Sequence, residues 1–199
     1  MKALKTNSFK IAVNFSVIIL LLFTACTQSG SSNNTKSEKN TKAKSIAEKP
    51  KIDIQVAILS GNLEVVKQHI EAGTDINMKD QMSGSTPLIT AVTFDKTAIV
   101  KALIDANADL TIKNNDGATA LHVAAFFCRV EIVQMLIDAK ANKNVKNNFG
   151  MTPRESVTGP FSEIKPIYEM VLLQLESLGL KLDLNELEKT RPVIAMMLQ

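Results

Sequence analysis

The sequence predicts an all-α solenoid of about four stacked helix-turn-helix repeats, followed by a modified C-terminal capping segment. A Gly-x-Thr motif recurs every 33 residues, at Gly84, Gly117 and Gly150. Threonine caps helices and proline suits their first turn, so Thr86-Pro87 and Thr152-Pro153 predict helix starts. Apolar side chains follow at helical spacing. A single unit cannot bury its apolar stripe alone, so the units are expected to stack.

The N-terminus predicts an export signal over residues 1–25. Lys2, Lys5 and Lys10 precede an apolar run from 11 to 23, which is short for a membrane span. Small residues then lead to Cys26. This arrangement resembles the lipobox of bacterial lipoproteins, whose cysteine is lipidated and becomes the new N-terminus. An ordinary signal peptide and an uncleaved anchor are the alternatives.

Residues 26–50 predict a lipidated cysteine followed by a disordered tether, because they are polar and lack aromatic side chains. The segment 27–51 carries a net charge of +4, whereas residues 52–199 carry −4. A domain of this charge, with no basic cluster, argues against nucleic-acid partners. We expect the protein in the bacterial cell envelope, facing the periplasm. Thr27 is not the aspartate that retains many lipoproteins at the inner membrane, which slightly favours the outer membrane.

Residues 51–159 resemble ankyrin repeats, since period, turn residues and helix pattern agree with that family. The resemblance implies two antiparallel helices per repeat, joined to the next repeat by a hairpin. Gly61 lies in the predicted inter-helix turn, and Asp95 and Cys128 take its place in later copies. If this turn needs a positive φ, cysteine tolerates it less well, at a cost of about 1 kcal/mol. Gly73 is replaced in the same way, by Asn107 and then Lys140.

Residues 160–199 no longer repeat cleanly and predict C-terminal capping helices. Ser162 is expected to cap a helix over 163–178 that ends at Gly179. Thr190-Arg191-Pro192 is expected to start a last short helix that runs to Leu198. We interpret the segment as a modified fourth repeat with a cap.

The sequence offers no catalytic motif, metal-ligand spacing or cofactor loop, so we predict a non-enzyme without metal, cofactor or small-molecule substrate. By resemblance, His122 is a structural histidine that links adjacent turns. His69 is expected to be a partly exposed helix residue. Cys128 is expected to be an inert filler of its turn, with a redox role as the alternative.

The resemblance implies a concave binding face made of first helices and hairpin tips, so an unidentified protein is the expected partner, with the membrane reached through the N-terminal lipid. Aromatic side chains at such faces often dominate binding. The helix candidates are Phe94, Phe126 and Phe127. The hairpin candidates are Met82, Asn115, Asp116, Phe149 and Met151. At least one of Phe126 and Phe127 could instead fill space between helices.

Three other functions stay open at this stage. The protein could inhibit a partner enzyme as a periplasmic inhibitor or immunity factor. It could be a protective envelope component with a redox-active Cys128. An enzyme with its site in residues 160–199 is the least favoured, since that segment carries no recognisable catalytic motif.

Overall fold

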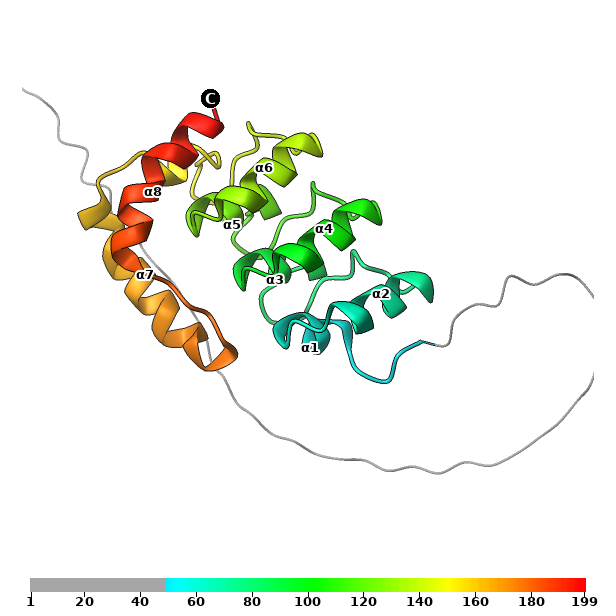
Figure 1. Ribbon diagram of the computed structural model, residues 1–199. Helices are drawn as coiled ribbons and strands as arrows, with labels where there is room; N and C mark the ends of the chain where they lie inside the picture. Colours follow the sequence, from blue (N-terminus) through cyan, green and yellow to red (C-terminus); the bar gives the residue numbers. More distant parts are fainter. Residues whose placement is uncertain (1–48) are drawn as a thin grey trace, which may run out of the picture. The chain divides into compact units, whose positions relative to one another are not determined.

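The computed structural model describes residues 49–199, which are built from helices and loops without a β-strand. The predicted signal peptide, Cys26 and nearly all of the predicted tether lie outside the described residues. Within the described part, no helix is both long enough and apolar enough to cross a membrane. Figure 1 shows the helices as successive antiparallel pairs that stack beside one another.

Three pairs form the regular part of the stack, each with a short first helix and a longer second helix. The pairs are α1 (Ile54–Leu59) with α2 (Leu63–Glu71), α3 (Pro87–Thr93) with α4 (Thr97–Asp105), and α5 (Ala120–Phe126) with α6 (Val130–Asp138). The first helices pack on one another as an inner row, and the second helices pack as an outer row. This arrangement confirms the predicted solenoid.

The core of the stack lies between the two rows. Ala57, Ala91 and Ala124 of the inner row are fully buried. Because their side chains are small, neighbouring inner helices can approach closely. Val66 and Val100 are equally buried in the outer row, where larger aliphatic side chains fill the wider space. The apolar surface of each pair is therefore covered by its neighbours, as the sequence predicts.

The inter-helix turns have a left-handed backbone, which meets the condition under which replacing glycine is costly. The angle φ is +73° at Gly61, +56° at Asp95 and +53° at Cys128. The turn that follows the second helix of each pair is also left-handed: φ is +71° at Gly73 and +66° at Lys140. The turns keep this conformation after glycine has been replaced, so the helix pairs impose the backbone geometry.

The fourth unit is rearranged. The helix predicted at Thr152-Pro153 is only a 3-10 turn, η1 (Glu155–Val157). Thr152 and Glu155 do cap each other, since the Glu155 N–H donates to Thr152 Oγ1 over 3.3 Å and the Thr152 N–H donates to Glu155 Oε2 over 2.7 Å. Gly159-Pro160 stops elongation, because a residue before proline is disfavoured in helical geometry.

Three helical segments follow, which are α7 (Phe161–Leu175), η2 (Glu176–Leu178) and α8 (Leu184–Met197). The turn η1 packs on α5, and α8 packs on α6, so together they stand where a fourth helix pair would be. In chain order, α7 is thus inserted between the inner and outer members of that pair. Figure 1 shows α7 at the edge of the molecule, next to α8.

The boundaries of these helices differ from two predictions. Pro160 rather than Ser162 occupies the N-cap of α7, although the helical segment ends at Gly179 as predicted, with φ at +96°. The last helix begins at Leu184, not near Pro192, which lies inside it. The reason is a better cap: the Asp183 carboxylate accepts hydrogen bonds from two backbone N–H groups of the first turn.

Candidate protein-binding surface

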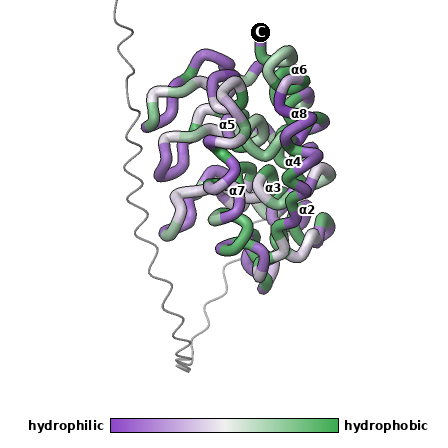
Figure 2. The backbone as a smooth tube through the Cα atoms, turned by 90° about the vertical axis from the view of Figure 1, so that its left-hand side faces the viewer, coloured by the Kyte–Doolittle hydropathy of each residue, from purple (hydrophilic) through white to green (hydrophobic). Residues whose placement is uncertain are grey.

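The inner helices leave one side free of the outer row, which we call the inner-helix face. It is made of two positions per helix that are equivalent across the repeats. In repeat order they are Val56 and Leu59, Thr90 and Thr93, and Val123 and Phe126. Figure 2 looks onto the stack with the hairpins projecting to one side and the outer helices on the other. The face extends across three repeats, which suits an extended partner more than a small molecule.

The hairpin tips border this face, and a single polar side chain organises each. The Asn114 Oδ1 atom accepts hydrogen bonds from the backbone of Asp116 at 3.0 Å and Ala118 at 2.9 Å. Asn147 does the same in the next hairpin. In the first hairpin, partial burial works to raise the pKa of Asp80, but hydrogen bonds from the loop outweigh it and lower the pKa. Each tip is therefore held in one shape.

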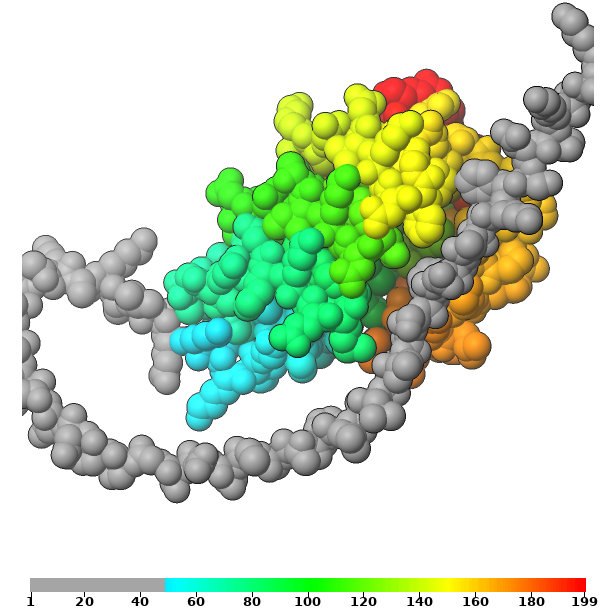
Figure 3. All heavy atoms as spheres, turned by 180° about the vertical axis from the view of Figure 1, so that it is seen from behind, coloured from blue at the N-terminus to red at the C-terminus, as the bar shows by residue number. Residues whose placement is uncertain are grey.

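Neighbouring hairpins are also tied together. The Asn115 side-chain amide donates to the Met82 carbonyl over 2.9 Å, and Asn148 repeats this contact to the Asn115 carbonyl over 2.9 Å. A Cβ atom at Gly84 or Gly117 would overlap the side-chain oxygen of the next asparagine, so only glycine leaves room for this ladder. In Figure 3 the hairpins appear side by side in teal, green and yellow.

The predicted hairpin residues have different surroundings. The Met82 side chain is 76% exposed and that of Phe149 is 46% exposed, so both are accessible. Asn115 is exposed, but its amide is used in the ladder. Asp116 is half-buried, and this desolvation raises its pKa. Met151 is half-buried, and its carbonyl binds His122. Their contacts with a partner remain predictions.

The three candidate phenylalanines are less accessible. Phe94 is half-buried against the core. Phe127 is only 7% exposed, so it fills space between the helices and does not lie on the surface. Phe126 is half-buried between Phe127, at 5.0 Å between ring centroids, and Tyr168 of α7, at 4.5 Å. Placing Phe127 on a free binding surface is therefore corrected, and the space-filling alternative holds for it.

The two histidines are both structural. The Thr119 N–H donates to His122 Nδ1 over 3.2 Å, so His122 carries its proton on Nε2 and donates to the Met151 carbonyl over 3.1 Å. This contact links adjacent hairpins, as the resemblance implies. His69 was expected to be partly exposed but is 1% exposed. Its ring bonds Thr74 Oγ1 over 3.0 Å and the Ile52 carbonyl over 2.7 Å, which ties the chain before α1 to α2.

The thiol of Cys128 is not arranged for reaction. It donates to the Leu187 carbonyl over 3.8 Å, and burial raises its pKa to about 11 despite the positive charges of Arg191 and Arg129. A thiol reacts as its thiolate, so at neutral pH this one is a poor nucleophile. Among residues 49–199, no group of three or more His, Cys, Asp or Glu side chains is placed to hold a metal ion.

A buried cluster around Tyr168 was not anticipated. The Tyr168 hydroxyl donates to the Phe126 carbonyl over 2.6 Å and accepts from Arg191 over 3.3 Å. Arg191 is 4% exposed and also donates to the Gly159 carbonyl over 2.9 Å. Burial raises the pKa of Tyr168 to about 12. The available sequence signal was the spacing of Tyr168 four residues from Ile164 and Leu172, which marks one helix face.

Comparison with known proteins identifies the repeats. Residues 54–147 match the family model for ankyrin repeats, in three copies. This part of the chain belongs to the ankyrin-repeat family. An ankyrin repeat-containing protein of Schizosaccharomyces pombe is 43% identical over 65 residues, which cover 32% of this chain and 30% of that protein. Human protein phosphatase 1 regulatory subunit 27 is 43% identical over 61 residues, or 31% of this chain and 39% of that protein.

A solved structure supports the same fold. The ankyrin repeat domain of Bcl-3, a member of the IkappaB protein family, superposes with a TM-score of 0.51 at 30% identity. The match covers 52% of this chain and 45% of that chain. Ankyrin domains are typically non-catalytic modules of protein interaction, and the present ankyrin stack has the same architecture.

Proposed function

We propose that this protein binds another protein without chemical conversion, through its inner-helix face and hairpin tips, and that a lipid on Cys26 holds it at a bacterial membrane. The observation that carries the proposal is the exposure of large apolar side chains on the first and third hairpins. Met78 is 58% exposed, Met82 76% and Phe149 46%. Methionine and aromatic side chains are enriched in protein interfaces relative to the rest of the protein surface.

Rigidity of the hairpins supports the same proposal. The asparagine ladder and the loop hydrogen bonds hold the tips in one conformation. A surface that is ordered before binding loses little conformational entropy when a partner docks. The ankyrin stack thus presents Met82 and Phe149 at fixed spacing, which suits selection of one partner surface.

A narrower version is favoured by one of the relatives. Protein phosphatase 1 regulatory subunit 27 is, by its name, a regulatory subunit of an enzyme. By analogy, the partner in the present case would be an enzyme that this protein inhibits or protects against. The redox alternative has little support, because the pKa of Cys128 is raised to about 11.

Affinity capture with comparison of variants tests the binding surface. The full chain, the double variant Met82→Ser/Phe149→Ser and the control Met196→Ser are used as baits on envelope extracts. Met196 is 61% exposed on α8, outside the hairpins, so its replacement removes a similar apolar surface from a different element. We expect the double variant to lose at least tenfold of any captured protein and the control to lose none. Equal capture by all three baits would exclude this surface.

The membrane part of the proposal is tested separately. Cys26→Ser in the full chain is expected to abolish incorporation of labelled palmitate and to release the protein from the membrane fraction. Cys128→Ser serves as the control and is expected to leave both unchanged. An unmodified Cys26 in the mass spectrum of the native protein would refute the lipid anchor.

A further inference from the structure

The C-terminal helix α8 covers the last helix pair of the ankyrin stack together with η1. Its Leu187, Arg191 and Ile194 side chains are buried, and it packs on α6 and η1. Further contacts fix it in place: the Leu187 carbonyl accepts from the Cys128 thiol at 3.8 Å, and Arg154 Nε donates to the Ala195 carbonyl over 3.2 Å. The apolar core at this end of the stack is therefore covered by α8 and η1.

The inserted helix α7 is docked through one face, where Val171, Leu172 and Leu175 pack against the core and Tyr168 also accepts a hydrogen bond from Arg191 of α8. Among its 15 residues only Tyr168 is fully buried, and Leu173 is 81% exposed. Within the described residues, the hydrogen bond from Tyr168 to the Phe126 carbonyl is the one side-chain hydrogen bond from α7 to the repeats. Its ion pair, Lys165 with Glu169 at 3.6 Å, lies within the helix and adds nothing to docking.

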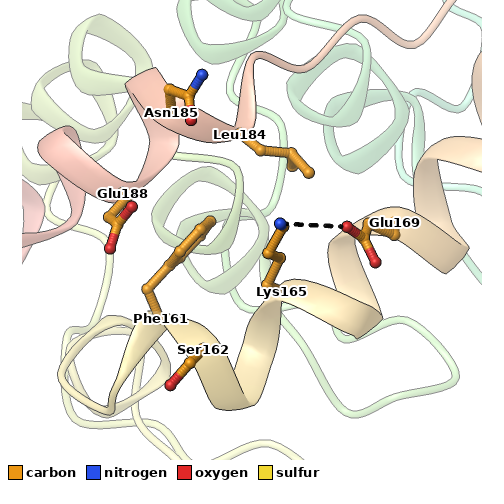
Figure 4. Close-up of a pocket in the computed structure, with 7 residues that line it drawn as sticks. All are labelled: Phe161, Ser162, Lys165, Glu169, Leu184, Asn185 and Glu188. Carbon is orange, nitrogen blue, oxygen red and sulfur yellow. Dashed lines mark ion pairs between the residues drawn. The ribbon is translucent and has the colours of Figure 1, made fainter.

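The helices α7 and α8 meet through Tyr168 and Arg191, and hollows open to solvent lie beside this contact. A cavity of about 490 Å³ lies between them and is lined by Phe161, Lys165 and Glu169 of α7 and by Leu184 and Glu188 of α8, among others (Figure 4). A second cavity, of about 390 Å³, lies beside Phe161 and Arg191. Both are open to solvent, so parts of the facing surfaces of α7 and α8 are not packed against each other.

What α7 covers is one end of the inner-helix face. The Tyr168 ring lies on Phe126, with centroids 4.5 Å apart. Figures 1 and 2 agree that α7 lies beside the inner row of helices. The face is open at its other end, since Val56 is 55% exposed whereas the equivalent Val123 is 8% exposed. The chain's own helix thus lies over part of the surface that binds partners in the proposed function.

Both ends of α7 are suited to movement. Gly159 precedes the helix, and a Cβ atom there would meet open space. Gly179 follows it with a φ of +96°, a conformation that glycine adopts readily. Glycine therefore gives the backbone conformational freedom at both ends of α7, with the Gly159 carbonyl bonded to Arg191 in the docked state.

We propose that α7 is a displaceable occupant of the inner-helix face, and that an amphipathic helix of the protein partner takes its place on Phe126. This inference rests on the proposed function and specifies its partner. The docked side of α7 shows the chemistry required: Tyr168 is flanked by Ile164, Val171 and Leu172, all half-buried. An aromatic anchor with aliphatic side chains three to four residues away is the pattern of a helix that binds in a groove.

A synthetic peptide of residues 160–179 serves as the probe, because it reproduces the proposed occupant. Its affinity is measured for the full chain and for the full-chain variants Tyr168→Ala and Tyr168→Ala/Phe126→Ala. Tyr168→Ala removes the ring and the hydroxyl that hold α7, so the peptide is expected to bind this variant at least tenfold more tightly than the wild type. The double variant also lacks the Phe126 ring, on which the peptide would dock, and is expected to bind the peptide no more tightly than the wild type. Equal affinity for all three proteins would overturn the proposal.

Hydrogen exchange distinguishes release of α7 from unfolding. In Tyr168→Ala, faster exchange is expected in α7 alone, with α5, α6 and α8 as protected as in the wild type. Loss of protection across α5, α6 and α8 would show that α7 belongs to the cooperative fold, and would overturn the proposal. Tyr168→Phe keeps the ring on Phe126 and is expected to give an intermediate change in α7.

These outcomes are independent of the capture experiment. If the hairpin variants capture the same proteins as the wild type but the peptide behaves as expected, the hairpin surface is refuted while α7 remains a displaceable helix. If a partner is captured and binds Tyr168→Ala no more tightly than the wild type, the displacement is refuted while partner binding stands. Support requires at least tenfold tighter binding of that partner to Tyr168→Ala.

Discussion

Four residues other than glycine adopt a left-handed backbone conformation in the turns, with φ between +53° and +66°. They are Asp95, Asn107, Cys128 and Lys140. Glycine occupies the equivalent positions in the first repeat. An L-residue in this conformation costs about 1–2 kcal/mol relative to glycine. The strain stays because the packed helices on both sides of each turn dictate its path.

Lys140→Gly is expected to raise the free energy of unfolding by about 1 kcal/mol, because it relieves the strain of a positive φ. Lys140 is exposed and its side chain makes no hydrogen bond or ion pair within the described residues, so little else is lost. Urea denaturation measures the change. Lys67→Gly, at an exposed position inside α2, is the control and is expected to lower stability by about 1 kcal/mol. A fall in stability for Lys140→Gly would contradict the argument.

His122 makes stability depend on pH. Burial is the main cause that lowers its pKa in the folded state, against an unfolded value of about 6.5. The unfolded chain therefore binds this proton more readily. The contribution of the neutral ring is complete above about pH 6.5 and is lost as the pH falls below it. Urea midpoints at pH 7.5 and pH 5 are expected to differ less for His122→Gln than for the wild type, and an equal difference would refute this role.

At the scale of elements, the repeats could be predicted from sequence, but the insertion could not. Period, turn residues and helix starts specify α1 to α6, because each copy repeats the same local chemistry. The same signals failed after Gly150, where Thr152-Pro153 predicts a helix that Gly159-Pro160 cuts short. The position of α7 depends on Tyr168 meeting Phe126, 42 residues away, and no local pattern encodes such a contact. The burial of Phe127 was likewise decided by packing.

The hairpin ladder gives a test of element geometry. Gly117→Ala would place a methyl group against the Asn148 side chain and strain a φ of +70°, whereas Gly150 has a φ of +75° with open space around its Cβ position. Gly150→Ala therefore measures the backbone strain alone, about 1 kcal/mol. Gly117→Ala is expected to lower the free energy of unfolding by about 1–3 kcal/mol more than Gly150→Ala, because the added methyl group overlaps the Asn148 side chain and disrupts the ladder. Equal losses in thermal denaturation would show that the asparagine yields freely.

At the scale of the whole molecule, the stack is closed at one end and open at the other. The pair α5 and α6 is covered by α3 and α4 on one side and by η1 and α8 on the other. Within residues 49–199 the first pair has a helix neighbour on one side only, and Val56 of α1 and Ile52 just before it are 55% and 47% exposed. In a repeat protein, stability comes largely from interfaces between neighbours, so the first pair lacks half of this contribution.

Native-state hydrogen exchange is therefore expected to show a gradient along the stack. Amides of α1 and α2 should exchange through local opening at a lower free energy than those of α3 to α6, because opening the first pair breaks a single interface. His69 opposes this opening through its bond to the Ile52 carbonyl. His69→Ala should therefore speed exchange in α1 and α2 and leave exchange in α5 and α6 unchanged. His122→Ala is the matched variant and should speed exchange in the third repeat. If His69→Ala changed exchange equally throughout, the described residues would unfold as one unit, and the interfaces would not act independently.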